Sequence, residues 1–174
     1  AGPATPEPLV LNPRLGEEID AYVTSLLQRN DFSGVILVAQ GGHPLFQKAY
    51  GLASREYRVS NTPQTRFMIG SIAKQFTAAG ILILQDQGKL QLNDPLDKFI
   101  PDFPRGEEIT LYHLLSHTSG VARDLPDLEH TMVAPHTLPE LAALIAPLPL
   151  SFAPGQGRSY SNNGYRLLAL VIEK

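Results

Sequence analysis

The chain has 174 residues, of which 43% are hydrophobic and 18% charged, and its net charge is −3. This length and composition are typical of a globular protein that can bury a sizeable core. The mild acidity, without a cluster of Lys and Arg, argues against nucleic acid as a partner, and no apolar run is long enough to cross a membrane. The absence of cysteine excludes a disulfide scaffold, a thiol enzyme and a zinc site built on cysteine.

The N-terminal part of the chain predicts one helix followed by a β-hairpin. Residues 1–8 are rich in proline and look like the mature end of an exported protein or like an artificial boundary; we favour export, to the periplasm or the medium. Asn12-Pro13 marks a helix start, and the apolar spacing that follows predicts a helix ending near Asn30. Two strands, 34–40 and 45–51, are joined by a Gly-Gly-His-Pro turn. The first is apolar throughout, so both its faces are expected to be covered, and two strands need further sheet partners.

A Ser-x-x-Lys motif, Ser71 to Lys74, lies where an irregular segment turns into a long apolar helix. The helix is predicted because residues 75–87 are good helix formers, four of which recur at helical spacing: Phe76, Ala79, Ile83 and Gln87. Ser71 would then lie on the first turn, at the positive end of the helix dipole, with Lys74 beside it. A lysine held near its neutral form could take the serine proton, although a serine cap with a surface lysine would give the same pattern. Phe67, Met68 and Gly70 are expected to support Ser71 as packing and turn residues.

After Gly88, which is expected to cap the motif helix, the chain predicts short helices separated by turns. They are expected after Asp94-Pro95, from Thr110 to His117, from Thr137 to about Ala146 and from Ser161 onward. Thr137 and Glu140 match a capping box. We therefore interpret residues 1–66 as the N-terminal part of an α/β domain and 67–174 as a mainly helical region that carries the motifs.

A second motif, Tyr160-Ser161-Asn162, lies just before the last predicted helix. A tyrosine beside a lysine can act as a base or proton shuttle, and an asparagine amide can hold a substrate carbonyl or orient the lysine. The alternative is a loop tyrosine over the core followed by an asparagine cap. The presence of both motifs in one chain favours the catalytic interpretation.

Ser71-Ile72-Ala73-Lys74 and Tyr160-Ser161-Asn162 together resemble the penicillin-recognising serine hydrolases of class C β-lactamase type, a group that includes DD-peptidases, D-aminopeptidases and esterases. Similar stretches extend the resemblance from about Phe32 to the end of the chain: 85–96, 109–120 and 152–165. The resemblance implies an α/β fold in which an antiparallel sheet is flanked by helices, with a mainly helical region beside it. The active site would lie in the cleft between them, and no cofactor or metal is implied.

The same resemblance implies a role for each motif residue. Ser71 would be the nucleophile that forms an acyl-enzyme, Lys74 would help to remove its proton, and Tyr160 would be the general base. Asn162 would contact the substrate, and the backbone N–H of Ser71 would be one oxyanion donor. The substrate would be a small amide or ester: a β-lactam, a D-amino-acid peptide or an ester. Ser161, where class C β-lactamases more often carry alanine, points to the peptidase and esterase branch.

The third motif of this family, Lys-Thr-Gly or His-x-Gly on a strand, does not occur in the sequence. The chain also stops at Lys174 inside a predicted apolar helix without a cap. With only two strands predicted, the sheet would be incomplete. We therefore expect a second polypeptide that carries the C-terminal half of the fold and this strand.

Two further interpretations compete with a serine hydrolase. His113 and His117 lie four residues apart and could bind zinc, but a metalloprotease motif needs glutamate at position 114, where the chain has Leu114. Ordinary hydrogen-bonded histidines are therefore favoured, and the Gly-x-Ser-x-Gly elbow of α/β-hydrolases is absent. The second alternative is a sensor or peptidoglycan-binding protein that acylates without turnover.

Residues 121–134 are expected to form a loop over the cleft, from which Arg123 and Asp124 could touch substrate.

Overall fold

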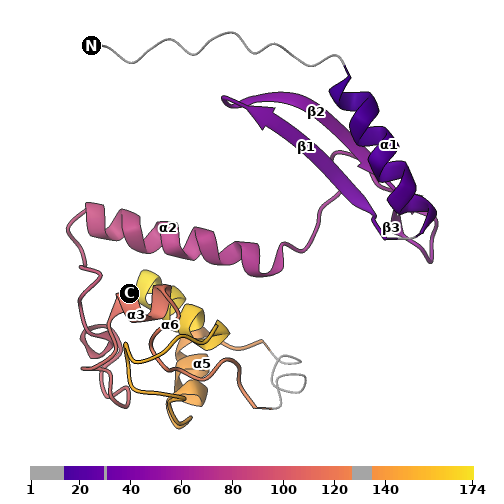
Figure 1. Ribbon diagram of the computed structural model, residues 1–174. Helices are drawn as coiled ribbons and strands as arrows, with labels where there is room; N and C mark the ends of the chain where they lie inside the picture. Colours follow the sequence, from indigo (N-terminus) through magenta and orange to yellow (C-terminus); the bar gives the residue numbers. More distant parts are fainter. Residues whose placement is uncertain (1–13, 30, 127–134) are drawn as a thin grey trace, which may run out of the picture. The chain divides into compact units, whose positions relative to one another are not determined.

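The computed structural model describes residues 14–29, 31–126 and 135–174. The chain divides into two compact units, Ala1–Met68 and Ile69–Lys174, which are both drawn in Figure 1. The helix boundaries predicted at Asn12-Pro13 and Asn30 lie outside the described residues.

The first unit consists of a helix and a β-hairpin. Helix α1 (Leu15–Gln28) precedes strands β1 (Gly34–Gln40) and β2 (His43–Tyr50), which pair antiparallel. The turn is only two residues long, because Gly41 and Gly42 both adopt positive φ, at 57° and 80°, as tight hairpin turns require. The predicted four-residue turn was therefore wrong, since His43 and the proline after it already belong to β2.

A second antiparallel pair, β3 (Leu52–Ser54) and β4 (Val59–Ser60), was not predicted. Strands of two and three residues are too short to show the alternation by which a strand is recognised. Leu37 of β1 is 56% exposed, so the described part of this chain does not by itself cover both faces of the strand.

Helix α1 packs on β2 through a polar contact as well as apolar ones. The Tyr50 hydroxyl donates to Asp20 Oδ1 at 2.5 Å, and Lys48 Nζ donates to Asp20 Oδ2 at 2.6 Å. Burial, with the nearby Asp20 carboxylate, raises the pKa of Tyr50 to about 12. The tyrosine therefore stays a neutral hydrogen-bond donor and joins the helix to the strand.

The second unit is helical and is built around α6 (Asn162–Glu173). This helix contacts α2 (Ala73–Asp86), α3 (Leu111–Leu115) and α5 (Leu138–Ile145), as Figure 1 shows. Two short 3₁₀ helices, η1 (Gly70–Ile72) and η2 (Leu96–Lys98), complete the described helical elements. The side chains at the centre of the core are almost fully buried: Ile81, Leu96, Ile109, Leu111, Leu114, Ile145, Leu167 and Leu168.

The predicted motif helix is confirmed as α2, and the face that packs into this core is not the one that carries Phe76 and Ile83. Ile81 is fully buried, whereas Phe76 and Ile83 are 66% and 56% exposed. The helix is apolar nearly all round, so apolar spacing alone could not identify its buried side. Phe67 and Met68 are 48% and 101% exposed, so the predicted packing role of these two residues was wrong.

Several local predictions are confirmed by the backbone. Gly70 and Gly88 have φ of +53° and +70°, as expected of turn and cap residues. The Thr137 and Glu140 capping box opens α5, and a similar box between Thr110 and His113 opens α3. The predicted mixed α/β fold with an incomplete sheet is confirmed. Across the described ranges, no helix is long and apolar enough to cross a membrane.

Candidate active site

Ser71 and Lys74 come together through a local change of helix type. Ser71 lies in η1, which runs directly into α2, and Lys74 is on the first turn of α2. Three residues of helix place both side chains on one face, so that Lys74 Nζ lies 3.4 Å from Ser71 Oγ. The Ser71 backbone N–H is on the first turn, where helical N–H groups are available for a ligand.

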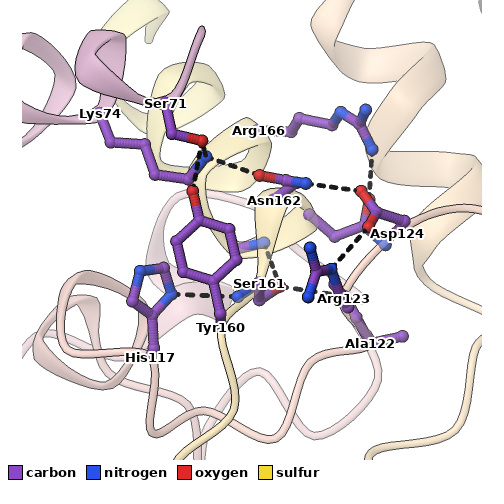
Figure 2. A network of polar contacts seen from close by, with 12 residues as sticks. Ser71, Lys74, His117, Ala122, Arg123, Asp124, Tyr160, Ser161, Asn162 and Arg166 are labelled. Carbon is purple, nitrogen blue, oxygen red and sulfur yellow. Dashed lines mark hydrogen bonds and ion pairs between the residues drawn. The ribbon is translucent and has the colours of Figure 1, made fainter. Parts of the chain in front are cut away.

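Tyr160 joins this pair from a segment 89 residues further along the chain. Its hydroxyl donates to Ser71 Oγ at 2.5 Å, and Lys74 Nζ lies 4.8 Å from the centre of its ring (Figure 2). The Lys74 ammonium, and then the hydrogen bond with Ser71, lower the pKa of Tyr160 below its ordinary value, because both favour the phenolate. The tyrosine is therefore suited to exchange a proton with the serine.

Asn162, the first residue of α6, completes the group by accepting a hydrogen bond from Lys74. Lys74 Nζ donates to Asn162 Oδ1 at 2.6 Å, a shorter contact than the one to Ser71. The Asn162 amide group then donates to Asp124 Oδ1 at 2.7 Å. The structure thus brings together Ser71, Lys74, Tyr160 and Asn162, all four of the site residues that the sequence predicts.

The segment 117–124 holds the Tyr160 loop in place through several hydrogen bonds. The Ser159 N–H donates to the His117 carbonyl at 3.0 Å, and the Ser161 N–H donates to His117 Nδ1 at 3.1 Å. Ser161 Oγ donates to the Ala122 carbonyl at 3.0 Å, and the Asn162 N–H donates to the Arg123 carbonyl at 2.8 Å. Because most of these bonds use backbone atoms, sequence patterns gave no sign of them.

His117 contacts both tyrosines near the site. Its ring lies 4.5 Å from that of Tyr160 and 5.1 Å from that of Tyr165, measured between centroids. Burial, and then the charges of Lys74 and Arg158, lower the pKa of His117 below its ordinary value. A neutral imidazole can accept at Nδ1, which agrees with the hydrogen bond from Ser161.

The histidines proposed as zinc ligands are engaged in the protein instead. His113 Nδ1 accepts the Thr110 N–H in the capping box of α3, while His117 binds the Tyr160 loop. Among the described residues, no group of three potential ligand side chains could hold a metal ion.

The role of Ser161 was missed by sequence reasoning, which considered an asparagine cap. Ser161 is the N-cap of α6, since its Oγ accepts the Gly164 N–H at 2.9 Å. Serine is among the preferred N-cap residues, so the Ser-x-x-Gly spacing could have indicated this role. Asp124, which the sequence analysis names as a residue that could touch substrate, accepts a hydrogen bond from Asn162. Of the loop predicted at 121–134, residues 127–134 lie outside the described residues.

Comparison with known proteins gives the family. The profile of the family described as Beta-lactamase matches residues 19–174. The chain belongs to the β-lactamase family. The resemblance inferred from the two motifs is thereby confirmed.

Three relatives illustrate the match. Penicillin-binding protein 4* of Bacillus subtilis (strain 168) is 35% identical over 166 residues, which cover 91% of this β-lactamase-family chain and 36% of the relative. The crystal structure of a penicillin-binding protein from Bacillus halodurans has 35% identity and a TM-score of 0.73, covering 87% of this chain and 48% of that one. A class C β-lactamase structure has 26% identity and a TM-score of 0.76, covering 90% and 43%. The chain therefore spans less than half the length of these relatives.

Proposed function

We propose that the protein is a serine hydrolase in which Ser71 forms an acyl-enzyme with an amide or ester substrate. The observation that carries the proposal is the convergence of Lys74 and Tyr160 on Ser71 Oγ, at 3.4 and 2.5 Å. A serine hydroxyl becomes an effective nucleophile when a neighbouring group can take its proton. Membership of the β-lactamase family supports this chemistry in general terms.

In the acylation step, Tyr160 in its phenolate form takes the Ser71 proton as Oγ attacks the substrate carbonyl carbon. A carbon–oxygen bond forms, and the carbonyl becomes an oxyanion that the Ser71 backbone N–H can stabilise. The intermediate collapses when the bond to the leaving amine or alcohol breaks. The leaving group takes the proton from Tyr160, which returns to the phenolate, and the acyl group stays on Ser71.

In deacylation, water replaces the leaving group. Tyr160 takes a proton from the water as its oxygen attacks the acyl carbon, and the bond to Ser71 Oγ then breaks. The proton passes from Tyr160 to Ser71, and the carboxylic acid product leaves. Throughout both steps Lys74 remains an ammonium that stabilises the phenolate, and Asn162 contacts the substrate amide or ester.

We propose a β-lactam, a D-amino-acid peptide or an ester as the substrate class. Ser161 supports the peptidase and esterase branch, because class C β-lactamases more often have alanine at this position. A binding or sensor protein that is acylated without turnover is the second candidate.

We also propose that a second polypeptide completes the fold and that the protein is exported. Support for the second polypeptide comes from the two-stranded sheets and from the apolar residues Phe76 and Ile83, which the described part of their own unit leaves exposed. Such residues usually pack against another surface. Support for export comes from the penicillin-binding relatives.

The experiment treats the native protein that contains this chain with a fluorescent penicillin and with a chromogenic ester. Mass spectrometry of the digested protein then locates any covalent label. We expect the label on the peptide that contains Ser71, and none in a Ser71→Ala variant. Label elsewhere, or equal label in the variant, would contradict the proposal. Continued release of the chromophore beyond one equivalent distinguishes a hydrolase from a protein that is only acylated.

A further inference from the structure

Asp124 lies at the far end of a row of hydrogen bonds that begins at Lys74, as Figure 2 shows. Lys74 Nζ donates to Asn162 Oδ1 at 2.6 Å, and Asn162 Nδ2 donates to Asp124 Oδ1 at 2.7 Å. The other oxygen of Asp124 accepts from Arg123 Nε at 3.2 Å. The Asp124 side chain is 27% exposed, against 69% for Arg123, so the carboxylate is the more sheltered member of this ion pair.

The two ends of this row determine how the Asn162 amide is oriented. A side-chain amide has a donor end and an acceptor end, whereas a carboxylate only accepts and an ammonium only donates. If the amide turned over, its oxygen would face the Asp124 carboxylate and its NH₂ group would face the Lys74 ammonium. Both hydrogen bonds would be lost and replaced by contacts between like groups. Asp124 therefore selects the orientation in which the Asn162 oxygen points at Lys74.

This orientation matters for Ser71 because a lysine side chain is long and flexible. Lys74 Nζ is 3.4 Å from Ser71 Oγ, so its shorter bond to Asn162 is the stronger hold on the ammonium. The backbone strengthens the same connection, since the Asn162 N–H donates to the Arg123 carbonyl, next to Asp124, at 2.8 Å.

We propose that Asp124 is a positioning residue, which orients the Asn162 amide so that its oxygen holds the Lys74 ammonium beside Ser71. This inference rests on the proposed acylation of Ser71 and adds a residue from outside both motifs. Asp124 acts through Asn162, and it exchanges no proton with the substrate. Replacing it should therefore slow acylation by misplacing Lys74.

The test compares rate constants for acylation of Ser71 in the native protein and in five variants. Asp124→Leu removes the acceptor, Asp124→Asn keeps an oxygen that can accept from Asn162, and Asn162→Ala removes the amide. The fourth variant combines Asp124→Leu with Asn162→Ala. The control is Glu108→Leu, because Glu108 is also a carboxylate in a surface ion pair, with Arg105. Thermal unfolding of each variant verifies that it is folded, and Asp124→Ala replaces Asp124→Leu in the series if the latter does not fold.

We expect Asp124→Leu to slow acylation about tenfold or more, as the loss of a charge-assisted hydrogen bond would. Asp124→Asn should stay within about threefold of the native rate, because its oxygen preserves the acceptor. The double variant should be no slower than Asn162→Ala alone, since residues that act through one contact are not additive. The inference is overturned if Asp124→Leu acylates as fast as the Glu108 control. It is also overturned if the two single effects multiply in the double variant.

A readout independent of activity separates this inference from the proposed function. If the native protein is not acylated at Ser71, the proposed function fails, but the side-chain NH₂ resonances of Asn162 still report on the row. These resonances are assigned by their absence from the Asn162→Ala spectrum. They should shift in Asp124→Leu and stay unchanged in the Glu108 control. Unshifted resonances in Asp124→Leu would overturn the positioning role by themselves.

Discussion

At the scale of single residues, the chemistry proposed for the site depends on whether the Tyr160 hydroxyl is protonated. The Tyr160 hydroxyl binds Ser71 Oγ, and the Lys74 ammonium near its ring lowers the pKa of Tyr160. The phenolate is therefore populated at lower pH than in an ordinary tyrosine, whose pKa is about 10. In the proposed mechanism, Tyr160 would combine access to the serine proton with stabilisation by a fixed neighbouring charge.

Replacing Lys74 with methionine should move the pH dependence of acylation to higher pH. Without the ammonium the phenolate loses its main stabilising neighbour, so the pKa of Tyr160 rises and the rate increases only at more alkaline pH. At neutral pH we expect a loss of about 10²-fold or more, the usual contribution of a general base. The measurement is a pH–rate profile for acylation, with Lys89→Met as a surface control. An unmoved profile in Lys74→Met would exclude Lys74 as the group that tunes Tyr160.

His117 should make the stability of the protein sensitive to mild acid. Its pKa is lowered, so between about pH 6.5 and that lower value the unfolded chain binds a proton that the folded chain does not. Stability is therefore complete above this window and falls as the pH decreases through it. Protonation would also remove the Nδ1 acceptor of the Ser161 N–H, so the Tyr160 loop should loosen.

The test is the midpoint of thermal unfolding between pH 8 and 5 for His117→Asn. Asparagine tolerates the φ of +62° at this position and can still accept a hydrogen bond, but it does not titrate. We expect the variant to lose the acid-dependent decrease within the window. His43→Asn, at an exposed position of β2, serves as the control and should keep the decrease. The same decrease in His117→Asn would assign it to another group.

At the scale of secondary-structure elements, the site depends on the packing of two loops. Backbone N–H groups of the segment that precedes α6 donate hydrogen bonds to carbonyl groups of segment 117–124. In one of these bonds, the Ser151 N–H donates to the Gly120 carbonyl at 2.8 Å. Gly120 has a φ of +75°, and a Cβ placed there would lie 2.1 Å from the Phe152 carbonyl oxygen. Only glycine permits this close approach. The position of Tyr160 therefore depends on a residue that has no chemical role.

A comparison of two glycines separates this close approach from backbone conformation. Gly88 has a similar φ of +70°, but a Cβ there would meet nothing within 4 Å. Gly88→Ala should cost about 1 kcal/mol, the usual penalty of a left-handed residue. Gly120→Ala should cost about 3 kcal/mol or more, because it adds a severe clash. Urea unfolding measures both variants, and equal costs would show that the contact with Phe152 does not constrain the loop.

At the scale of the whole molecule, exposed apolar side chains and small sheets indicate surfaces that a further segment would cover. Within its unit α2 buries Ile81 but leaves Phe76 and Ile83 exposed, and among the described residues each sheet of the first unit has two strands. Two-stranded sheets are marginally stable without further strands or packing partners. Both features are what a fold completed by another segment would show.

The proposed second polypeptide predicts two components in the native protein. Under denaturing conditions, mass spectrometry should find this 19.0 kDa chain together with a second polypeptide of similar size. Under native conditions, the two should migrate as one species, because the exposed apolar side chains would be covered in the complex. A single 19.0 kDa component that still turns over substrate would contradict this prediction.

The family and the mixed fold could be predicted from the sequence and are confirmed, and the sequence also named the four residues that the structure brings together in the candidate site. Ser71 with Lys74 and Tyr160 with Asn162 form two short motifs, and it was their presence in one chain, with the resemblance to a known family, that indicated these residues. The buried face of α2 became known from the packing in the folded chain, because that helix is apolar nearly all round. The tertiary structure also paired Asn162 with Asp124, 38 residues away, and His117 with the Ser161 N–H, 44 residues away. Such contacts depend on how the loops pack against α6, and no local sequence pattern indicates that packing.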